Sequence, residues 1–81
     1  MILYVGNVYF GLEEEQIKEL FERYGKVVSI NMMTDRETGR SRGYGFIEME
    51  NDQDAELAKN ELDGALVSGR NIKVNYAAKQ K

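Results

Sequence analysis

The sequence predicts an α+β domain in which two helices cover one face of a four-stranded antiparallel sheet. Two observations carry this prediction: four short segments have strand-type composition and alternation, and two longer segments have helical periodicity. They occur in the order β-α-β-β-α-β, and two right-handed β-α-β units placed side by side give the strand order 4-1-3-2. Both helices lie on one face of this sheet, and no further element is predicted to cover the other face. We therefore expect that other face to be open.

The first strand and the first helix are predicted within residues 1–24. Residues 1–6 form a short apolar strand, on which alternation places Tyr4 opposite the face of Leu3. Gly25 follows the predicted helix and fits a left-handed C-cap. The helix, residues 13–24, has one apolar stripe at helical spacing: Ile17, Leu20, Phe21 and Tyr24.

The second and third strands are predicted at residues 27–34 and 42–50, joined by a charged loop with Gly39 at its tip. On the second strand, Asn31 and Met33 point away from the core. The third strand has an unusual alternation, because its small residues and its aromatic residues lie on opposite faces. One face carries Gly43, Gly45, Ile47 and Met49, and the other carries Arg42, Tyr44, Phe46 and Glu48.

The second helix and the last strand complete the frame. Residues 51–63 are predicted to be helical, with Asn51 or Asp52 as the N-cap and Gly64 at the end. Residues 70–76 are predicted as the last strand. The buried stripe of the helix consists of Ala55, Ala58 and Leu62.

Composition fits one folded domain, expected at residues 1–78 with a short basic tail at 79–81. Cysteine and histidine are absent from the sequence, which removes disulfides, thiolate and imidazole catalysis, and nearly all zinc sites. We therefore expect no cofactor and no metal. No apolar run approaches a membrane span and no signal-peptide pattern precedes the first strand, so we expect an intracellular, cytoplasmic monomer without a membrane partner.

The net charge of −3 by itself argues against a nucleic-acid partner. The charges are sorted, however. The two predicted helices hold ten acidic and three basic residues, whereas the remainder holds four acidic and eight basic residues. The acidic surface is therefore expected mainly on the helical side, away from the open face of the sheet.

The open face combines three aromatic rings from two neighbouring strands: Tyr4, Tyr44 and Phe46. Flat rings on an uncovered sheet can stack nucleic-acid bases, at about 1–3 kcal/mol per base. Polar side chains around such a platform can bind base edges and phosphates. The pattern therefore predicts a site for single-stranded nucleic acid.

Two segments carry a resemblance to the RNA recognition motif family. Residues 42–49, Arg-Gly-Tyr-Gly-Phe-Ile-Glu-Met, resemble its eight-residue ribonucleoprotein motif, and residues 3–8 are similar to its six-residue companion. The resemblance extends over essentially the whole chain and is strongest to small single-domain bacterial RNA-binding proteins and to the domain of plant glycine-rich RNA-binding proteins. It implies a ferredoxin-like sandwich, base stacking at Tyr4, Tyr44 and Phe46, and a role in post-transcriptional regulation.

The sequence departs from the family pattern in two places. Met49 occupies a position that is usually aromatic, but alternation turns it toward the core, so we expect little effect on binding. A glycine-rich or long basic tail is missing, and modest affinity is therefore expected. The partner implied is single-stranded RNA, with single-stranded DNA as a weaker ligand and no small-molecule substrate.

Polar residues around the platform are candidates for contacts to phosphates and base edges. For each of them a solvated surface position is the alternative, and Glu48 has a third option, an ion pair with Lys73 or Arg42. The candidates are Arg42, Lys73, Asn75, Asn31, Met33, Glu48, Arg40 and Lys79.

Two other functions compete with RNA binding. A protein partner could dock on the acidic helical face. The specialised Arg-x-Phe mode is unsupported, because no aromatic residue follows Arg70 closely. An acyl-phosphate hydrolase on this frame would need an anion loop with an Arg, and residues 7–12 contain no Arg and a single Gly. We therefore expect that the protein is not an enzyme.

Overall fold

The computed structural model describes residues 1–77, and its elements follow the predicted order with one addition near the end. The elements are β1 (Ile2–Gly6), α1 (Glu14–Glu22), β2 (Val27–Thr34), β3 (Ser41–Met49), α2 (Asp52–Leu62), β4 (Leu66–Val67), β5 (Arg70–Asn71) and β6 (Lys73–Tyr76). The predicted tail, residues 79–81, lies outside the described residues.

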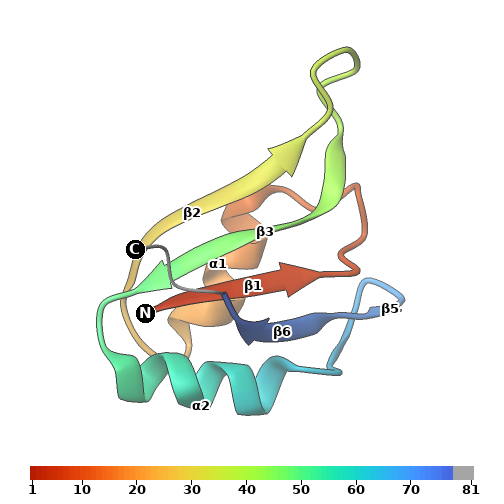
Figure 1. Ribbon diagram of the computed structural model, residues 1–81. Helices are drawn as coiled ribbons and strands as arrows, with labels where there is room; N and C mark the ends of the chain where they lie inside the picture. Colours follow the sequence, from red (N-terminus) through yellow and green to blue (C-terminus); the bar gives the residue numbers. More distant parts are fainter. Residues whose placement is uncertain (78–81) are drawn as a thin grey trace.

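The main sheet has the order β2-β3-β1-β6, with every neighbouring pair antiparallel. This is the predicted order 4-1-3-2, because β6 is the fourth long strand of the chain. In Figure 1, α1 lies behind the sheet and α2 runs below it, along the β6 side. Buried residues of both helices join one core with the same face of the sheet. The predicted two-layer fold is confirmed, and the front face of the sheet is not covered by either helix.

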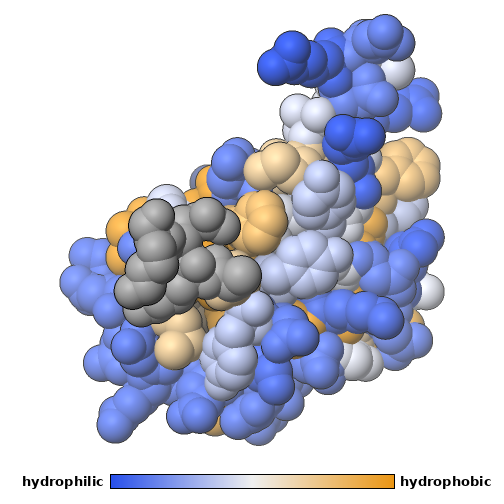
Figure 2. Space-filling model, viewed as in Figure 1, coloured by the Kyte–Doolittle hydropathy of each residue, from blue (hydrophilic) through white to orange (hydrophobic). Residues whose placement is uncertain are grey.

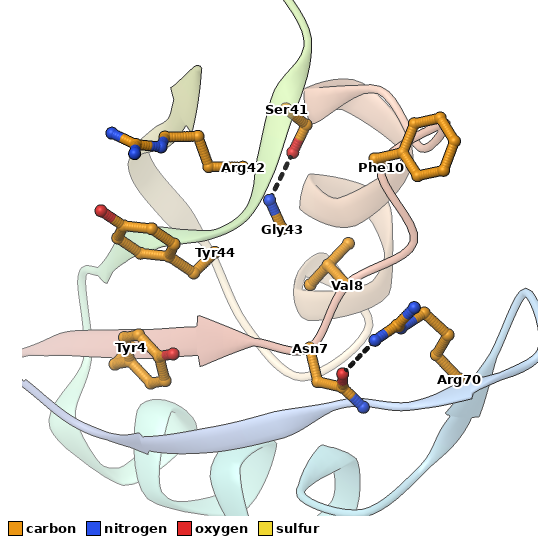
Figure 3. A pocket seen from close by; sticks show the side chains of 9 residues that line it. All are labelled: Tyr4, Asn7, Val8, Phe10, Ser41, Arg42, Gly43, Tyr44 and Arg70. Atoms are coloured by element: carbon orange, nitrogen blue, oxygen red, sulfur yellow. Dashed lines mark hydrogen bonds between the residues drawn. The ribbon is translucent and has the colours of Figure 1, made fainter. Parts of the chain in front are cut away.

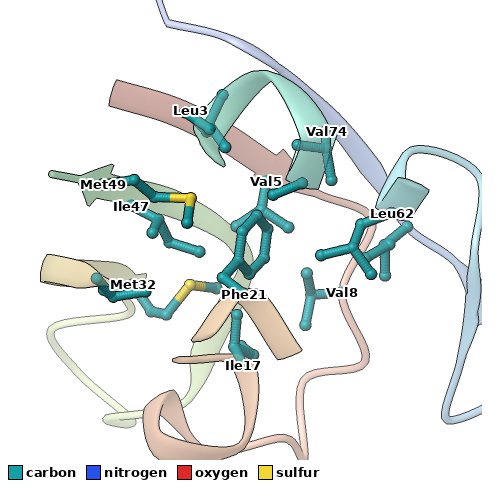
Figure 4. Packing of buried hydrophobic residues seen from close by; sticks show 14 residues of the cluster. Leu3, Val5, Val8, Ile17, Phe21, Met32, Ile47, Met49, Leu62 and Val74 are labelled. Carbon is teal, nitrogen blue, oxygen red and sulfur yellow. The ribbon is translucent and has the colours of Figure 1, made fainter. Parts of the chain in front are cut away.

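One hydrophobic core fills the space between the sheet and the helices. Figure 4 shows Phe21 of α1 near the middle of this cluster. Met49 is 1% exposed, so its predicted inward orientation is confirmed. The core consists of Leu3, Val5, Val8, Ile17, Phe21, Val27, Met32, Ile47, Met49, Ala55, Ala58, Leu62, Ile72 and Val74.

The prediction of one continuous last strand over residues 70–76 is wrong. β5 pairs with β4 in a separate two-stranded ribbon, and β6 pairs with β1. Ile72 lies between them, where its N–H donates to the carbonyl of Ala65 and its carbonyl accepts from Gly64. The backbone groups around Ile72 therefore serve the local ribbon first, and the chain joins the main sheet only at Lys73.

The predicted left-handed C-cap at Gly25 is also wrong. α1 ends at Glu22 with Arg23 as its C-cap in right-handed conformation, and Gly25 does not have a positive φ. A Cβ at Gly25 would instead collide with the side chain of Asp54 on α2. This glycine is explained by the close approach of α2. The helix ends predicted at Asn51 and Gly64 are confirmed, since Asn51 accepts from Gln53 at 2.8 Å and Gly64 has φ +87°.

The two edge strands of the sheet are each contacted by a carboxylate. Glu14 Oε2 accepts a hydrogen bond from the N–H of Met32 in β2 at 2.8 Å. Asp63 Oδ1 accepts from the N–H of Val74 in β6 at 2.9 Å. Covering edge N–H groups in this way satisfies them and limits strand addition by other chains.

Candidate nucleic-acid interface

A straight row of four residues crosses the open face of the sheet. The strand register places Phe46 opposite both Asn31 on β2 and Tyr4 on β1, and it places Tyr4 opposite Asn75 on β6. Residues directly opposite one another share a face of an antiparallel sheet. The row therefore puts two aromatic rings at the centre of the face and an amide side chain on each edge.

The three predicted rings form one cluster. The ring centroids of Tyr4 and Tyr44 are 6.2 Å apart, and those of Tyr4 and Phe46 are 6.0 Å apart. Phe46 is 36% exposed although it lies in a central strand, whereas Tyr4 and Tyr44 are half-buried. Figure 2 shows this face, with pale and orange residues gathered over β3 and β1 and hydrophilic residues around them. The structure thus brings together the rings that alternation placed on one face.

Glycines shape the backbone under these rings. A Cβ at Gly6 would collide with the Tyr4 ring, with Cζ at 2.7 Å and Cε2 at 2.8 Å. The Tyr4 ring therefore packs directly on the backbone of Gly6. Gly43 has φ +84°, a conformation that favours glycine, and its carbonyl accepts from the N–H of Val8 at 2.9 Å. This bond continues the pairing of the first and third strands beyond Gly6.

The buried glycine of β3, Gly45, allows β2 to approach closely. A Cβ at Gly45 would lie 2.6 Å from the carbonyl oxygen of Asn31 and 2.6 Å from Met32 Sδ. The close neighbour of Gly45 is therefore β2, the strand on which Asn31 pairs with Phe46.

The polar candidates are distributed around the rings at different positions. Asn31, Asn75, Arg42 and Lys73 are exposed, and Met33 is half-buried. Lys73 lies opposite Gly6 and Glu48 lies opposite Ile2, at the other end of β1. Within residues 1–77 Glu48 forms no ion pair, so the geometry does not support its pairing with Lys73 or Arg42. Arg40 is exposed in the β2–β3 turn, and Lys79 lies outside the described residues.

The β2–β3 turn is held by its first residue. Asp35 Oδ1 accepts from the backbone N–H groups of Glu37 at 2.7 Å and Thr38 at 3.2 Å. These two bonds, with a smaller contribution from the charge of Arg42, lower the pKa of Asp35 below its ordinary value. The turn therefore has a defined shape at neutral pH, next to the strand that carries Arg42.

A pocket of about 360 Å³ adjoins the rings at the end of β1. Only Tyr4, Arg42 and Tyr44 of its lining were predicted as site residues. The other six lining residues were not predicted: Asn7, Val8, Phe10, Ser41, Gly43 and Arg70. Figure 3 shows Phe10 on one side of the pocket, Arg42 and Tyr44 on the other, and Gly43 and Val8 between them. The one signal in the sequence for this pocket was the pair of adjacent aromatic residues Tyr9 and Phe10. They lie in a loop, outside both the alternating pattern of the strands and the apolar stripes of the helices.

These observations define a class first: a small α+β domain whose sheet is uncovered on one face and carries an aromatic cluster there. The sequence profile of the RNA recognition motif matches residues 3–73. The chain belongs to the RNA recognition motif family, and the resemblance stated from residues 3–8 and 42–49 is confirmed.

Known relatives agree with this membership. The chain is 46% identical over 77 residues to RbpA of Synechocystis, a protein named for RNA binding, covering 95% of this chain and 76% of the relative. It is 45% identical over 75 residues to the chloroplastic 31 kDa ribonucleoprotein of Nicotiana sylvestris, covering 93% of this chain. It spans only 24% of that relative's length.

Solved structures show the same fold. The crystal structure of RNA-binding protein PG1 matches with a TM-score of 0.94 and 44% identity, covering 100% of this chain and 98% of that chain. The RNA recognition motif of Rna15 with bound GU RNA matches with a TM-score of 0.89 and 35% identity, covering 96% and 83% of the two chains.

Proposed function

We propose that this protein is a single-stranded RNA-binding domain that stacks bases on Tyr4, Tyr44 and Phe46. The observation that carries the proposal is the ring cluster, with centroid distances of 6.2 and 6.0 Å on the sheet face that neither helix covers. Burial of these rings in the core would stabilise the fold, because aromatic side chains have a large apolar surface. Their position at the surface is explained by a ligand with flat faces of its own.

The arrangement supports an extended ligand lying across the sheet. Bases on the rings place the sugar-phosphate backbone near the exposed cations Arg42 and Lys73, while Asn31 and Asn75 offer amide groups to base edges. Met33, Glu48, Arg40 and Lys79 extend the proposed contact surface. The cations are few, so binding rests mainly on stacking and has a shallow salt dependence.

The membership of a family named for RNA recognition favours this function over the two alternatives. The acidic helical face remains free for a protein partner, but no observation favours that use over the aromatic face. An enzymatic role has no support from the family.

The proposal is tested by titrating labelled single-stranded RNA with the protein and with a Tyr44→Ala, Phe46→Ala double variant. A preferred RNA is first selected from a random pool. Each ring is worth about 1–3 kcal/mol of stacking, so we expect an affinity loss of at least about 30-fold. Leu57→Ala is the matched control, because it removes an exposed apolar side chain of α2, 47% exposed, on the other side of the molecule.

Wild-type affinity in the double variant, with an unchanged circular dichroism spectrum, would refute the proposed stacking site. A DNA version of the selected sequence tests the further expectation that RNA is preferred.

We propose that the domain acts as a monomer. Sedimentation equilibrium with and without RNA measures its mass in solution and checks this. 

The location of the protein stays a prediction. Neither helix in the part of the chain that the structure describes is long and apolar enough to cross a membrane. The relatives include a cyanobacterial protein and a chloroplastic one. We propose a cytoplasmic location, which fractionation of the source cells would test.

A further inference from the structure

The pocket at the end of β1 is continuous with the ring cluster. Tyr4 and Tyr44 belong to the ring cluster and also line the pocket, so an RNA strand bound on the rings can extend directly into the pocket. Its volume of about 360 Å³ lies at the small end of the ~300–1,000 Å³ range typical of small-ligand sites. Gly43 lies between its two sides (Figure 3), where a Cβ would come within 3.1 Å of the carbonyl oxygen of Val8.

Phe10 provides an aromatic surface that the fold itself does not use. Its side chain is 54% exposed, and it is neither in the core nor among the partly buried residues packed against the core. Its only aromatic neighbour within the described residues is Tyr9, with ring centroids 5.0 Å apart. An exposed ring beside a pocket that already contains two platform tyrosines is suited to stack one more base.

Arg70 provides a positioned cation on the same pocket. Its Nη2 donates to Oδ1 of Asn7 over 2.6 Å, and Asn7 Nδ2 donates to the carbonyl of Asn71 over 2.8 Å. Asn7 itself has φ +55°, an uncommon conformation for a residue with a side chain. Within residues 1–77 Arg70 forms no ion pair, so most of its five N–H donors remain available for an anionic oxygen.

We infer that this pocket binds one further nucleotide of the RNA strand, beyond those on the three-ring platform, with the base on Phe10 and its phosphate on Arg70. The inference rests on the proposed RNA-binding function and deepens it. It assigns roles to Phe10, Arg70 and the orienting Asn7, which lie outside the third-strand motif. It also predicts the direction in which the bound strand leaves the sheet, past the end of β1.

The test compares RNA oligonucleotides of different length on the whole protein. The shortest oligonucleotide that the wild type binds is extended by one nucleotide, separately at its 5′ and 3′ ends. We expect one of the two extensions to tighten binding by roughly 5- to 150-fold. In Phe10→Leu this gain is lost, while the affinity for the short oligonucleotide stays at the wild-type value.

Arg70→Ala gives an independent readout of the phosphate contact. With the extended oligonucleotide, the slope of log affinity against log salt should become shallower by about 0.7, the value for one phosphate of a single strand. Arg23→Ala is the charge-matched control, because Arg23 is exposed at the end of α1 and should leave the slope unchanged. Tyr9→Leu is the control for the ring, since Tyr9 does not line the pocket.

The outcomes separate the two claims. If the short oligonucleotide binds but neither extension tightens binding, or if the gain survives in Phe10→Leu, the pocket does not hold a nucleotide and the platform stands. Loss of the gain in Tyr9→Leu to the same extent as in Phe10→Leu would also overturn the inference, because loop shape would then explain the effect. If wild-type protein binds no oligonucleotide at all, both the proposed function and this inference fail.

Discussion

Gly6→Ala is expected to weaken RNA binding without removing any side chain from the interface. The three atoms nearest to a Cβ at this position all belong to the Tyr4 side chain, Cζ at 2.7 Å and Cε2 at 2.8 Å among them. Contacts below 3.0 Å require something to move. The ring is the end of a side chain that can rotate, so we expect Tyr4 to swing away from its place between Tyr44 and Phe46.

The magnitude follows from what this movement changes. Folding should not suffer, because Gly6 does not have a positive φ and Gly→Ala in an accessible conformation stabilises by about 0.4–1 kcal/mol through the unfolded chain. Binding should lose up to one stacked base, about 1–3 kcal/mol, which is roughly 5- to 150-fold in affinity. The substitution therefore separates stability from binding.

The assay is a double-mutant cycle that combines fluorescence-polarisation titration of RNA with urea unfolding. Gly6→Ala, Tyr4→Ala and the double variant are compared with the wild type. Because Gly6→Ala acts through the Tyr4 ring, it should cause no further loss of affinity once that ring is absent. Wild-type affinity in Gly6→Ala, or an equal loss in both backgrounds, would refute this reasoning.

Two further predictions concern the frame that presents the rings. Asp63→Ala leaves the part-buried N–H of Val74 without its acceptor and should destabilise the domain by about 1–3 kcal/mol in urea unfolding, whereas Asp63→Asn, which retains an oxygen, should cost less. The carboxyl of Asp35 should titrate below its ordinary pKa, because the N–H groups of Glu37 and Thr38 bind its charged form. Its stabilising contribution is therefore complete above the ordinary pKa and is lost as the pH falls through the lowered one. NMR titration of the Asp35 carboxyl tests this, and an unshifted pKa would contradict it.

The sequence by itself determined the order of helices and strands and the set of rings on the open face of the sheet. Helical periodicity and strand alternation are local properties of the chain, and they specified the order of the elements and the outward position of Tyr4, Tyr44 and Phe46. The handedness of β-α-β connections then left one arrangement of the long strands. The third-strand motif added the family, which the profile match over residues 3–73 confirmed.

Tertiary structure alone decided the features that depend on residues far apart in the chain. Gly25 makes room for Asp54 of α2, and the strand expected at residues 70–76 is interrupted because Ile72 bonds to Ala65. The pocket joins Phe10 to Arg70, whose partner Asn7 is 63 residues away in sequence. Periodicity describes which way a side chain points from its own element. It does not describe which distant side chain it meets, because that depends on how the elements pack.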